Sequence, residues 1–517
     1  MTALMARTHS MLNLDQFAAQ NEKFFEQHWI ETPHFIRAAA PGVPIILGAK
    51  GGGKSALRRY LSELQHDSEV SCPALDLGDF RHALIHRQLA QLVGKIGIDD
   101  QLLLASYWRQ LFLLHALRDV SIRAQPGSDQ EVAALAAIRS VLADHNLAER
   151  PTLTLLSWLG TLRESLDSIL MQRVVPQSTP FIFGLTCREL DRLERLPNDE
   201  RFSNACLAAA TLLTSSRKHV CLIVDGLDKI RPADSESHAF ILGSIVQAVS
   251  QLALDSSLSC AFSIKVLVPR ELFRALNDRD LDQYVTLRAQ LSWDRHTLKE
   301  VLKRRVAAAC RRAQAARSEL SEFLPEKTLN GENTIDYLIR HTMYRPRQLL
   351  TYFHGIAEAK GWLISESSVW NEASAEEVVH RVEAESVSLA QHFVSEYRTQ
   401  YPQLRGVLES LAGLTSVLEL GTLREKFGSD CESHLNMLYD CGAIGLIEIV
   451  HAALNREGCY SYRKVGGIVT PINCEFIYKP GARPFWLPQL PNDTLMAVHP
   501  MLRQCFGVKA SSDYVIG

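Results

Sequence analysis

Short apolar runs alternate with helical patterns through the first half of the chain. Val43–Leu47, His219–Val224 and Ile264–Val268 are largely apolar and bounded by turn-forming residues, as strands buried on both faces are. Weaker strand signals lie at Cys72–Leu77 and Val285–Leu291. Strands that alternate with helices are typical of βαβ units. The pattern therefore predicts an α/β fold with a parallel sheet flanked by helices.

Helical spacing dominates the long segment between Cys72–Leu77 and His219–Val224. We expect a helical insertion at about residues 81–216, which the simple βαβ pattern does not require. Within it, helices are predicted at 88–96, 102–120, 131–144 and 204–214, and a short extended piece at 179–186. After the insertion, Ala239–Leu254 has the spacing of an amphipathic helix.

The pattern changes after Trp293. A basic helix is predicted from Arg295 to Arg317, and its Lys and Arg residues are interpreted either as a solvated face or as a contact with phosphate, DNA or a neighbouring subunit. Further helices follow up to about residue 398.

A compact unit is predicted from about residue 399. Short helices are expected at 407–411, 422–427 and 432–439, followed by a β-hairpin formed by 444–450 and 460–464. Three helices and a hairpin in this order are typical of a winged helix. The predicted domains are an N-terminal lead-in (1–40), an α/β core (41–294), a helical lid (295–398) and a winged-helix-like domain (399–517).

Composition narrows the class of protein. The chain has 517 residues, of which 46% are hydrophobic and 22% charged, so it is globular rather than disordered or fibrous. The 55 Lys and Arg residues nearly balance the 58 Asp and Glu residues, which excludes a strongly basic nucleic-acid coat. The 11 cysteines form no C-x-x-C pair, which favours a reducing compartment. With no long apolar run and no signal-like start, we expect a cytoplasmic protein without a membrane partner.

The sharpest motif lies between the first predicted strand and the helix that follows it. It reads Gly48, Ala49, Lys50, Gly51, Gly52, Gly53, Lys54, Ser55, with Ala56 continuing the helix, and it matches the P-loop pattern G-x-x-x-x-G-K-[ST]. Glycines let successive backbone N–H groups point at phosphate oxygens, and a helix N-terminus adds its positive dipole end. Lys54 would bind the β- and γ-phosphates, and the Ser55 hydroxyl would ligate Mg²⁺.

Two further motifs supply charges that such a site needs. Asp225 ends an apolar strand, so its carboxylate is expected at the sheet edge where ligands bind, holding Mg²⁺ through water. Asp228 is the candidate that orients or deprotonates the attacking water. Arg270 follows another strand and is either a sensor of the γ-phosphate or a surface arginine packed on the sheet.

Together these motifs resemble the STAND and AAA+-like branch of P-loop ATPases, in particular the NACHT and KAP groups and related bacterial K-G-x-G-K-S ATPases. The resemblance implies ATP and Mg²⁺ as cofactors, Arg270 as the sensor arginine, and a lid motif at Tyr344–Arg347 whose Pro346 contacts the nucleotide. It also implies a mobile-element or antiphage role. The sequence departs from hydrolytic relatives at Gly226, where most carry an acid, and at Lys229.

Two hypotheses follow. In the first, the protein is an ATPase whose hydrolysis of MgATP drives a conformational or assembly change, with a homo-oligomer as a candidate product. In the second, it is a nucleotide-gated switch with little turnover, whose C-terminal domain contacts DNA or a protein effector. In the predicted winged helix, His434 and Asn436 occupy the third helix, but that helix also carries Glu432 and Asp440 and few cations.

Overall fold

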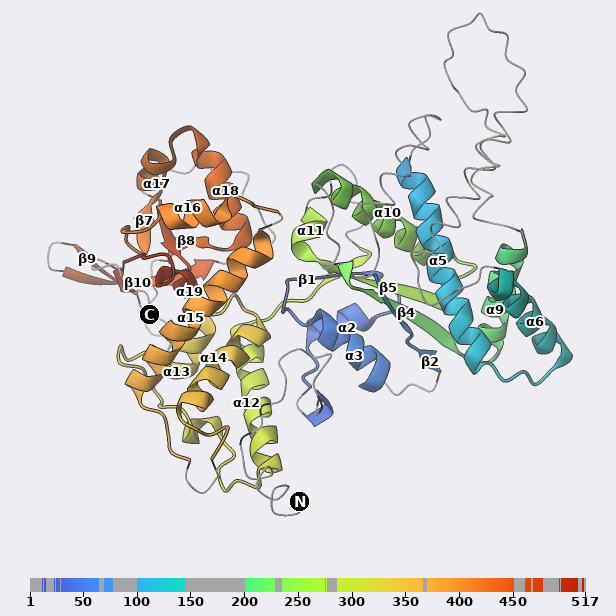
Figure 1. Ribbon diagram of the computed structural model, residues 1–517, viewed down its shortest axis with the longest axis horizontal. Helices are drawn as coiled ribbons and strands as arrows, with labels where there is room; N and C mark the ends of the chain where they lie inside the picture. The colour runs from blue at the N-terminus through green and yellow to red at the C-terminus, as the bar shows by residue number, and fades with distance from the viewer. Residues whose placement is uncertain are drawn as a thin grey trace, which may run out of the picture. The chain divides into compact units, whose positions relative to one another are not determined.

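The chain forms two compact units, which are described separately (Figure 1). The α/β unit comprises Glu31–Ser292, and the C-terminal unit comprises Met1–Ile30 together with Trp293–Gly517. The computed structural model describes residues 31–64, 69–77, 100–144, 200–227, 235–274, 286–365, 370–398, 400–450, 461–465, 468–477, 494–509 and 514–515, with 12, 14, 23, 25–27, 29–30, 276 and 492.

A six-stranded parallel sheet forms the centre of the α/β unit. The strand order is β2-β4-β5-β1-β6, with β3 also paired to β4, and every described pair is parallel. The strands are β1 (Ile45–Gly48), β2 (Val70–Ser71), β3 (Ala74–Asp76), β4 (His219–Asp225), β5 (Phe262–Pro269) and β6 (Arg288–Gln290). β1 is buried along its whole length and β4 and β5 nearly so, as expected for strands covered on both faces. The predicted parallel α/β fold is therefore confirmed.

Helices cover both faces of this sheet. They are α2 (Pro33–Ala39), α3 (Lys54–Arg59), α5 (Asp100–Arg123), α6 (Asp129–Asp144), α9 (Glu200–Ser215), α10 (Ser235–Leu254) and α11 (Arg270–Arg274), and α3 continues into the π-helical turn η3 (Tyr60–Leu64). α2 and α3 lie on one face, and α5, α10 and α11 lie on the other (Figure 1). The connections from β1 and from β5 run in opposite directions along the sheet, so right-handed crossovers place their helices on opposite faces.

Helices also lie between β3 and β4, where the sequence predicts a helical insertion. α5, α6 and α9 fall within the expected range, whereas the predicted helix at 88–96 and extended piece at 179–186 lie outside the described residues. α5 packs on α10, where the Trp108 indole N–H donates to Ser244 Oγ at 3.1 Å. The insertion therefore contributes to the same hydrophobic core as the sheet.

A buried lysine on β5 attaches α2 to the sheet. The Lys265 side chain is 1% exposed, and its ammonium donates to the carbonyl oxygens of Ala38, Ala40 and Val43. Burial lowers the pKa of Lys265, and the three carbonyls compensate the charged form. This contact positions the chain segment that enters β1.

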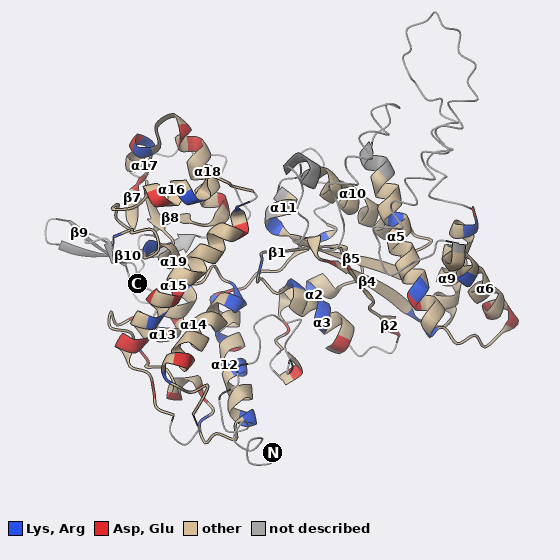
Figure 2. Ribbon diagram, in the orientation of Figure 1, with Lys and Arg blue, Asp and Glu red and all other residues tan. Residues whose placement is uncertain are grey.

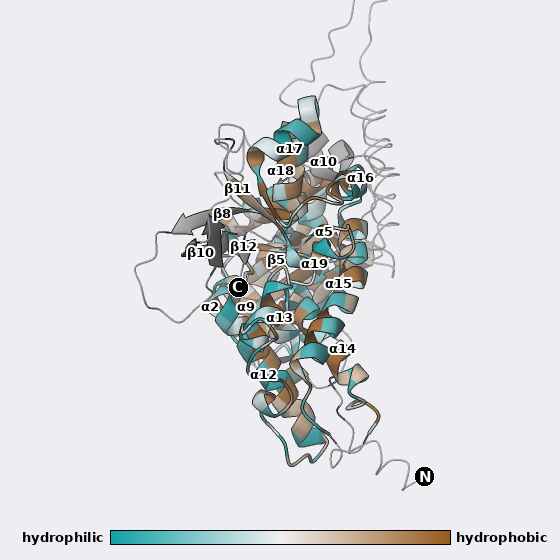
Figure 3. Cartoon of the chain, turned by 90° about the vertical axis from the view of Figure 1, so that its left-hand side faces the viewer, coloured by the Kyte–Doolittle hydropathy of each residue, from teal (hydrophilic) through white to brown (hydrophobic). Residues whose placement is uncertain are grey.

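The C-terminal unit begins with a helical domain. Its helices are α12 (Arg295–Arg312), the 3₁₀ turn η6 (Leu320–Glu322), α13 (Thr334–Arg340), α14 (Pro346–Ala359) and α15 (Ala375–Tyr397). Asp294 and Ser374 form capping boxes at the starts of α12 and α15. Apolar and hydrophilic residues are interspersed along α12 and α14 (Figure 3), and the buried residues of α14 are mostly apolar, with Gln348 the polar exception.

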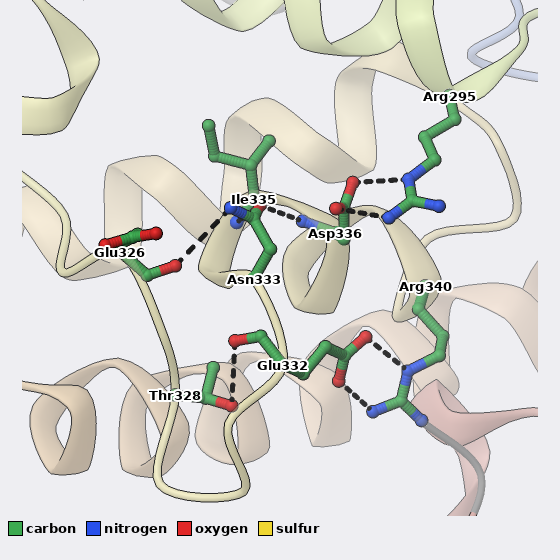
Figure 4. A network of polar contacts seen from close by, with 8 residues as sticks. All are labelled: Arg295, Glu326, Thr328, Glu332, Asn333, Ile335, Asp336 and Arg340. Atoms are coloured by element: carbon green, nitrogen blue, oxygen red, sulfur yellow. Dashed lines mark hydrogen bonds and ion pairs between the residues drawn. The ribbon is translucent and has the colours of Figure 1, made fainter. Parts of the chain in front are cut away.

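Charged contacts fix the short helix α13 between its neighbours (Figure 4). Arg340 binds both carboxylate oxygens of Glu332, at 3.1 and 2.7 Å, and Arg295 at the start of α12 pairs with Asp336. Asn333 accepts from the Ile335 amide and so caps α13. The Arg295–Asp336 pair therefore joins α13 to α12, whereas the forked Arg340–Glu332 pair holds the loop before α13 against the end of the same helix.

The basic face of α12 binds the N-terminal segment of the same chain. Lys and Arg residues lie along this helix (Figure 2). Arg304 donates to the carbonyl oxygen of Trp29 at 3.0 Å, and Arg312 donates to Gln27 in the 3₁₀ turn η2 (Phe25–Gln27) at 2.9 Å. These two cations thus bind another segment of the same chain. The sequence predicted instead a solvated face or a contact with phosphate, DNA or a neighbouring subunit.

The last part of the C-terminal unit combines short helices with an antiparallel sheet. In chain order its elements are α16 (Leu404–Ser410), β7 (Val417–Glu419), α17 (Leu420–Phe427), η8 (Gly428–Asp430), α18 (Cys431–Cys441), β8 (Ile444–Val450), β9 (Ser461–Val465), β10 (Ile468–Ile477), β11 (Leu495–Val498), α19 (Pro500–Arg503) and β12 (Tyr514–Val515). The strand order is β12-β9-β10-β8-β11-β7. The three predicted helices are present as α16, α17 and α18.

The predicted pairing of the hairpin was wrong. Strands do form at 444–450 and 461–465, but β10 lies between them and pairs with both. The alternating pattern identifies strands and not their partners, and the longer β10 offers backbone groups to β8 with its second half and to β9 with its first half.

None of the helices in the described parts of the chain combines the length and apolar character needed to cross a membrane.

A buried histidine connects the helical domain to the last part of the unit. His499 Nε2 lies 3.1 Å from the Thr342 carbonyl oxygen, and its Nδ1 accepts from the Met501 amide at 3.3 Å. Because a carbonyl can only accept, Nε2 carries the hydrogen and the ring is neutral. Burial, with the nearby Arg503 charge, lowers the pKa of His499 to about 3.

Acidification should therefore destabilise this connection. The unfolded histidine takes up a proton below its ordinary pKa of 6.5, whereas folded His499 resists protonation down to about 3, so stability present above 6.5 is lost as the pH falls between those values. His499→Gln keeps one hydrogen-bond acceptor and one donor. Between about pH 7.5 and pH 5, we expect this variant to lose about 2 kcal/mol less unfolding free energy than the unsubstituted protein. Chemical denaturation at both pH values measures it. An equal pH dependence in both proteins would contradict the assignment.

Candidate functional site

The glycine-rich loop joins β1 to α3 at the carboxyl edge of the parallel sheet. Gly53 has a φ of 101° and is the N-cap of α3, a left-handed conformation that disfavours other residues. A Cβ on Gly52 would lie 2.9 Å from the Ala49 carbonyl oxygen, which already accepts the Gly52 amide. The glycines thus allow a loop that closes tightly on itself ahead of a helix N-terminus.

Lys54 is the first residue of α3, and its side chain turns back over the loop. It is 7% exposed, and its ammonium donates to the carbonyl oxygens of Gly48 at 2.8 Å and Ala49 at 3.1 Å. Ser55 and Ala56 follow in the first turn of α3, while Lys50 is exposed at the loop. A positive charge is therefore held where the loop amides and the helix dipole also favour an anion.

Strand register brings the second motif to the same edge. Val266 of β5 is paired with Ile45 of β1 on one side and with Val224 of β4 on the other. Only β5 therefore lies between β1, which leads into the glycine loop, and β4, which ends in Asp225. Gly48 is paired with Pro269, and Arg270 follows directly at the start of α11, 8% exposed. Strands β1, β4 and β5 all end at one edge.

The connections that follow β1 and β5 run in opposite directions along the sheet. After β1 the chain passes through α3 to the far side of the sheet, whereas after β5 it passes through α11 to β6 on the other side of β1. Loops that diverge from neighbouring parallel strands leave a gap between them, and ligands of open α/β sheets bind there. The glycine loop and Arg270 flank that position.

An ion pair joins α3 to the end of β4. Arg58 Nη1 lies 3.4 Å from Asp225 Oδ2, across 167 positions of sequence. The other carboxylate oxygen of Asp225 accepts the Gly226 amide at 2.8 Å, and Gly226 has a φ of 89°. Asp225 is thus an oriented carboxylate that already faces one cation, and its donor oxygens are of the kind that hard divalent cations prefer.

A second aspartate lies beside it. Asp76 of β3 is the register partner of Asp225, and the next amide, that of Leu77, donates to the Asp225 carbonyl oxygen at 2.8 Å. Paired residues of parallel strands direct their side chains to the same face. The edge therefore carries two carboxylates from adjacent strands.

Not every predicted site residue can be placed at this edge. Asp228 lies outside the described residues. Pro346 begins α14 in the C-terminal unit, and the preceding Arg345 is buried there, binding Glu396 at 2.7 Å and the Tyr397 hydroxyl at 3.4 Å. The structure thus brings together residues 48–56, Asp225 and Arg270, and places Pro346 in a different unit.

Arg58 and Asp76 lie at this edge although the sequence motifs did not predict them. Arg58 lies four positions after Lys54, the spacing that puts two side chains on one face of a helix. Asp76 ends a short apolar run in the same way that Asp225 does. Both signals were present, but neither is specific without the strand order.

Comparison with known proteins identifies one segment. A family model described as the FunZ-associated C-terminal helical domain matches residues 296–369, the range that contains nearly all of α12 and all of α13 and α14. No curated protein shows significant similarity to the chain. A C-terminal helical domain is therefore present, as the helical pattern after Trp293 predicted.

The close approach at Gly52 can be tested by adding one methyl group. In Gly52→Ala the new Cβ would meet backbone atoms of Ala49 that cannot rotate away, so we expect a loss of about 1–3 kcal/mol in unfolding free energy. Gly42→Ala is the matched control, because a Cβ there meets nothing within 4 Å, and its effect should stay within about 1 kcal/mol. Equal stability of the two variants by denaturant titration would refute the loop geometry.

Proposed function

We propose that the protein is a P-loop ATPase that binds ATP with Mg²⁺ at residues 48–55 and hydrolyses it. The observation that carries this proposal is the convergence of the glycine loop and Asp225 at one sheet edge, where Arg58 links their elements at 3.4 Å. A phosphate-binding loop and a separate carboxylate nearby are the two parts that a magnesium nucleotide requires.

Each residue has a part in this proposal. The loop amides and Lys54 would bind the phosphates, with the ammonium exchanging its Gly48 and Ala49 carbonyl contacts for phosphate oxygens. Ser55 and Asp225 would hold Mg²⁺, and when bound the ion neutralises charge on the β- and γ-phosphates. Arg270, beside the loop, would sense the γ-phosphate with its forked guanidinium.

Gly226 is the observation that favours the second candidate, a nucleotide-gated switch with little turnover. Its positive φ places a glycine where hydrolytic relatives carry an acid, so the residue after Asp225 offers no base. In the C-terminal part, the order α16, β7, α17, α18, β8 supports a winged-helix-like domain. Because α18 carries Glu432 and Asp440 and no Lys or Arg, a protein effector fits it better than DNA.

Replacing Lys54 tests nucleotide binding. Lys54→Ala should weaken the binding of a fluorescent ATP analogue by about 30-fold or more, because the loop loses its charge-assisted contact with phosphate. Arg59→Ala is the matched control on the same helix, since Arg59 pairs with Glu63 at 2.7 Å. Unchanged affinity in folded Lys54→Ala protein would exclude the loop as the nucleotide site.

Replacing Asp228 separates binding from turnover. Asp228→Ala should bind ATP within a few-fold of the unsubstituted protein and lose about 100-fold in phosphate release, because the water loses its base. Phosphate release and analogue fluorescence, measured on the same samples, check both parts. Persisting turnover would show that another group activates the water, and Asp76 would be the next carboxylate to replace.

A further inference from the structure

We propose that Arg58 is a built-in counter-ion of Asp225 that competes with a divalent cation for this carboxylate. The inference rests on the proposed function, because it concerns the carboxylate assigned there to Mg²⁺. Arg58 would set how strongly the site binds a divalent metal ion. It would thereby also set how much that binding depends on nucleotide.

The contact between Arg58 and Asp225 is specific to Arg58 and is not shared by the neighbouring arginine. Arg58 and Arg59 are consecutive on α3, yet Arg59 pairs with Glu63 on its own side of the helix at 2.7 Å, whereas Arg58 crosses to β4. The Arg58 and Asp225 side chains are only 24% and 13% exposed, so bulk solvent screens them incompletely. The guanidinium therefore makes the electrostatic potential at the carboxylate less negative.

The geometry also makes the contact easy to replace. At 3.4 Å, a single Nη1···Oδ2 contact is longer than the 2.7–2.9 Å of strong charge-assisted bonds, and Arg340 in the same protein shows the forked alternative with Glu332. Oδ1 of Asp225 accepts the Gly226 amide, and Oδ2 is the oxygen that faces Arg58. A cation entering there must displace the guanidinium.

Competition has a consequence for the protein without nucleotide. Arginine remains charged at every physiological pH, so the free protein always presents Asp225 partly neutralised. A divalent ion alone then binds weakly, whereas an ion that arrives with phosphates gains their contacts as well. The site would in this way favour the metal–nucleotide complex over free metal.

The test titrates Mn²⁺, as a substitute for Mg²⁺, into the full-length protein without nucleotide and measures free Mn²⁺ by electron paramagnetic resonance. Arg58→Gln should bind Mn²⁺ roughly three- to tenfold more tightly than the unsubstituted protein, because the competing charge is gone. Arg58→Lys should stay close to the unsubstituted protein, and Arg59→Gln should not differ from it. Adding Asp225→Asn to Arg58→Gln should remove the gain.

Equal or weaker Mn²⁺ binding by folded Arg58→Gln overturns the proposal and would mean that Arg58 positions Asp225 instead. A gain that survives the Asp225→Asn substitution also overturns it, because the metal would then bind elsewhere. Failure of the proposed function is separate: it would appear as an absence of ATP-analogue binding in the unsubstituted protein, while the Mn²⁺ titration still reports the competition at Asp225.

Discussion

Parallel register across β4, β5 and β1 is the constraint on which the candidate site depends. Because parallel strands all end at the same edge, Gly48, Pro269 and Asp225 are brought to one side of the sheet although long stretches of chain separate them. The divergence of the connections after β1 and β5 then leaves space between the loops. Neither the glycine loop nor the aspartate would form a site if β4 ran in the opposite direction.

Burial gives this edge its electrostatic character. Lys54, Asp225 and Arg270 are all largely buried, and charges in such surroundings interact more strongly than on an open surface. The Lys54 ammonium donates to two main-chain carbonyl oxygens, which fix its position. Asp225 is held by a main-chain amide and by a cation. The loop is therefore cationic, and the strand end is a carboxylate with a replaceable partner.

Much of the α/β unit could be predicted from the sequence, because its signals are local. Strands buried on both faces leave continuous apolar runs, and the tight loop needs glycines at fixed spacing. Pairing is not local, and so the sequence could not show that Asp76 lies beside Asp225 or that β10 separates β8 from β9. Arg58 was missed for the same reason, since its partner is 167 positions away.

The same distinction between local sequence signals and long-range contacts applies to the segment 344–347. Its sequence resembles a lid motif, and the structure shows how the segment is held: Tyr344 has a φ of 51°, and the buried Arg345 guanidinium is engaged by Glu396 and Tyr397 of α15. Gln348 accepts from the Met343 amide, which closes the turn before α14. A segment fixed at both ends has little conformational freedom of its own. Pro346 is therefore a fixed part of the C-terminal unit, in which His499 also contacts the Thr342 carbonyl oxygen just before this segment.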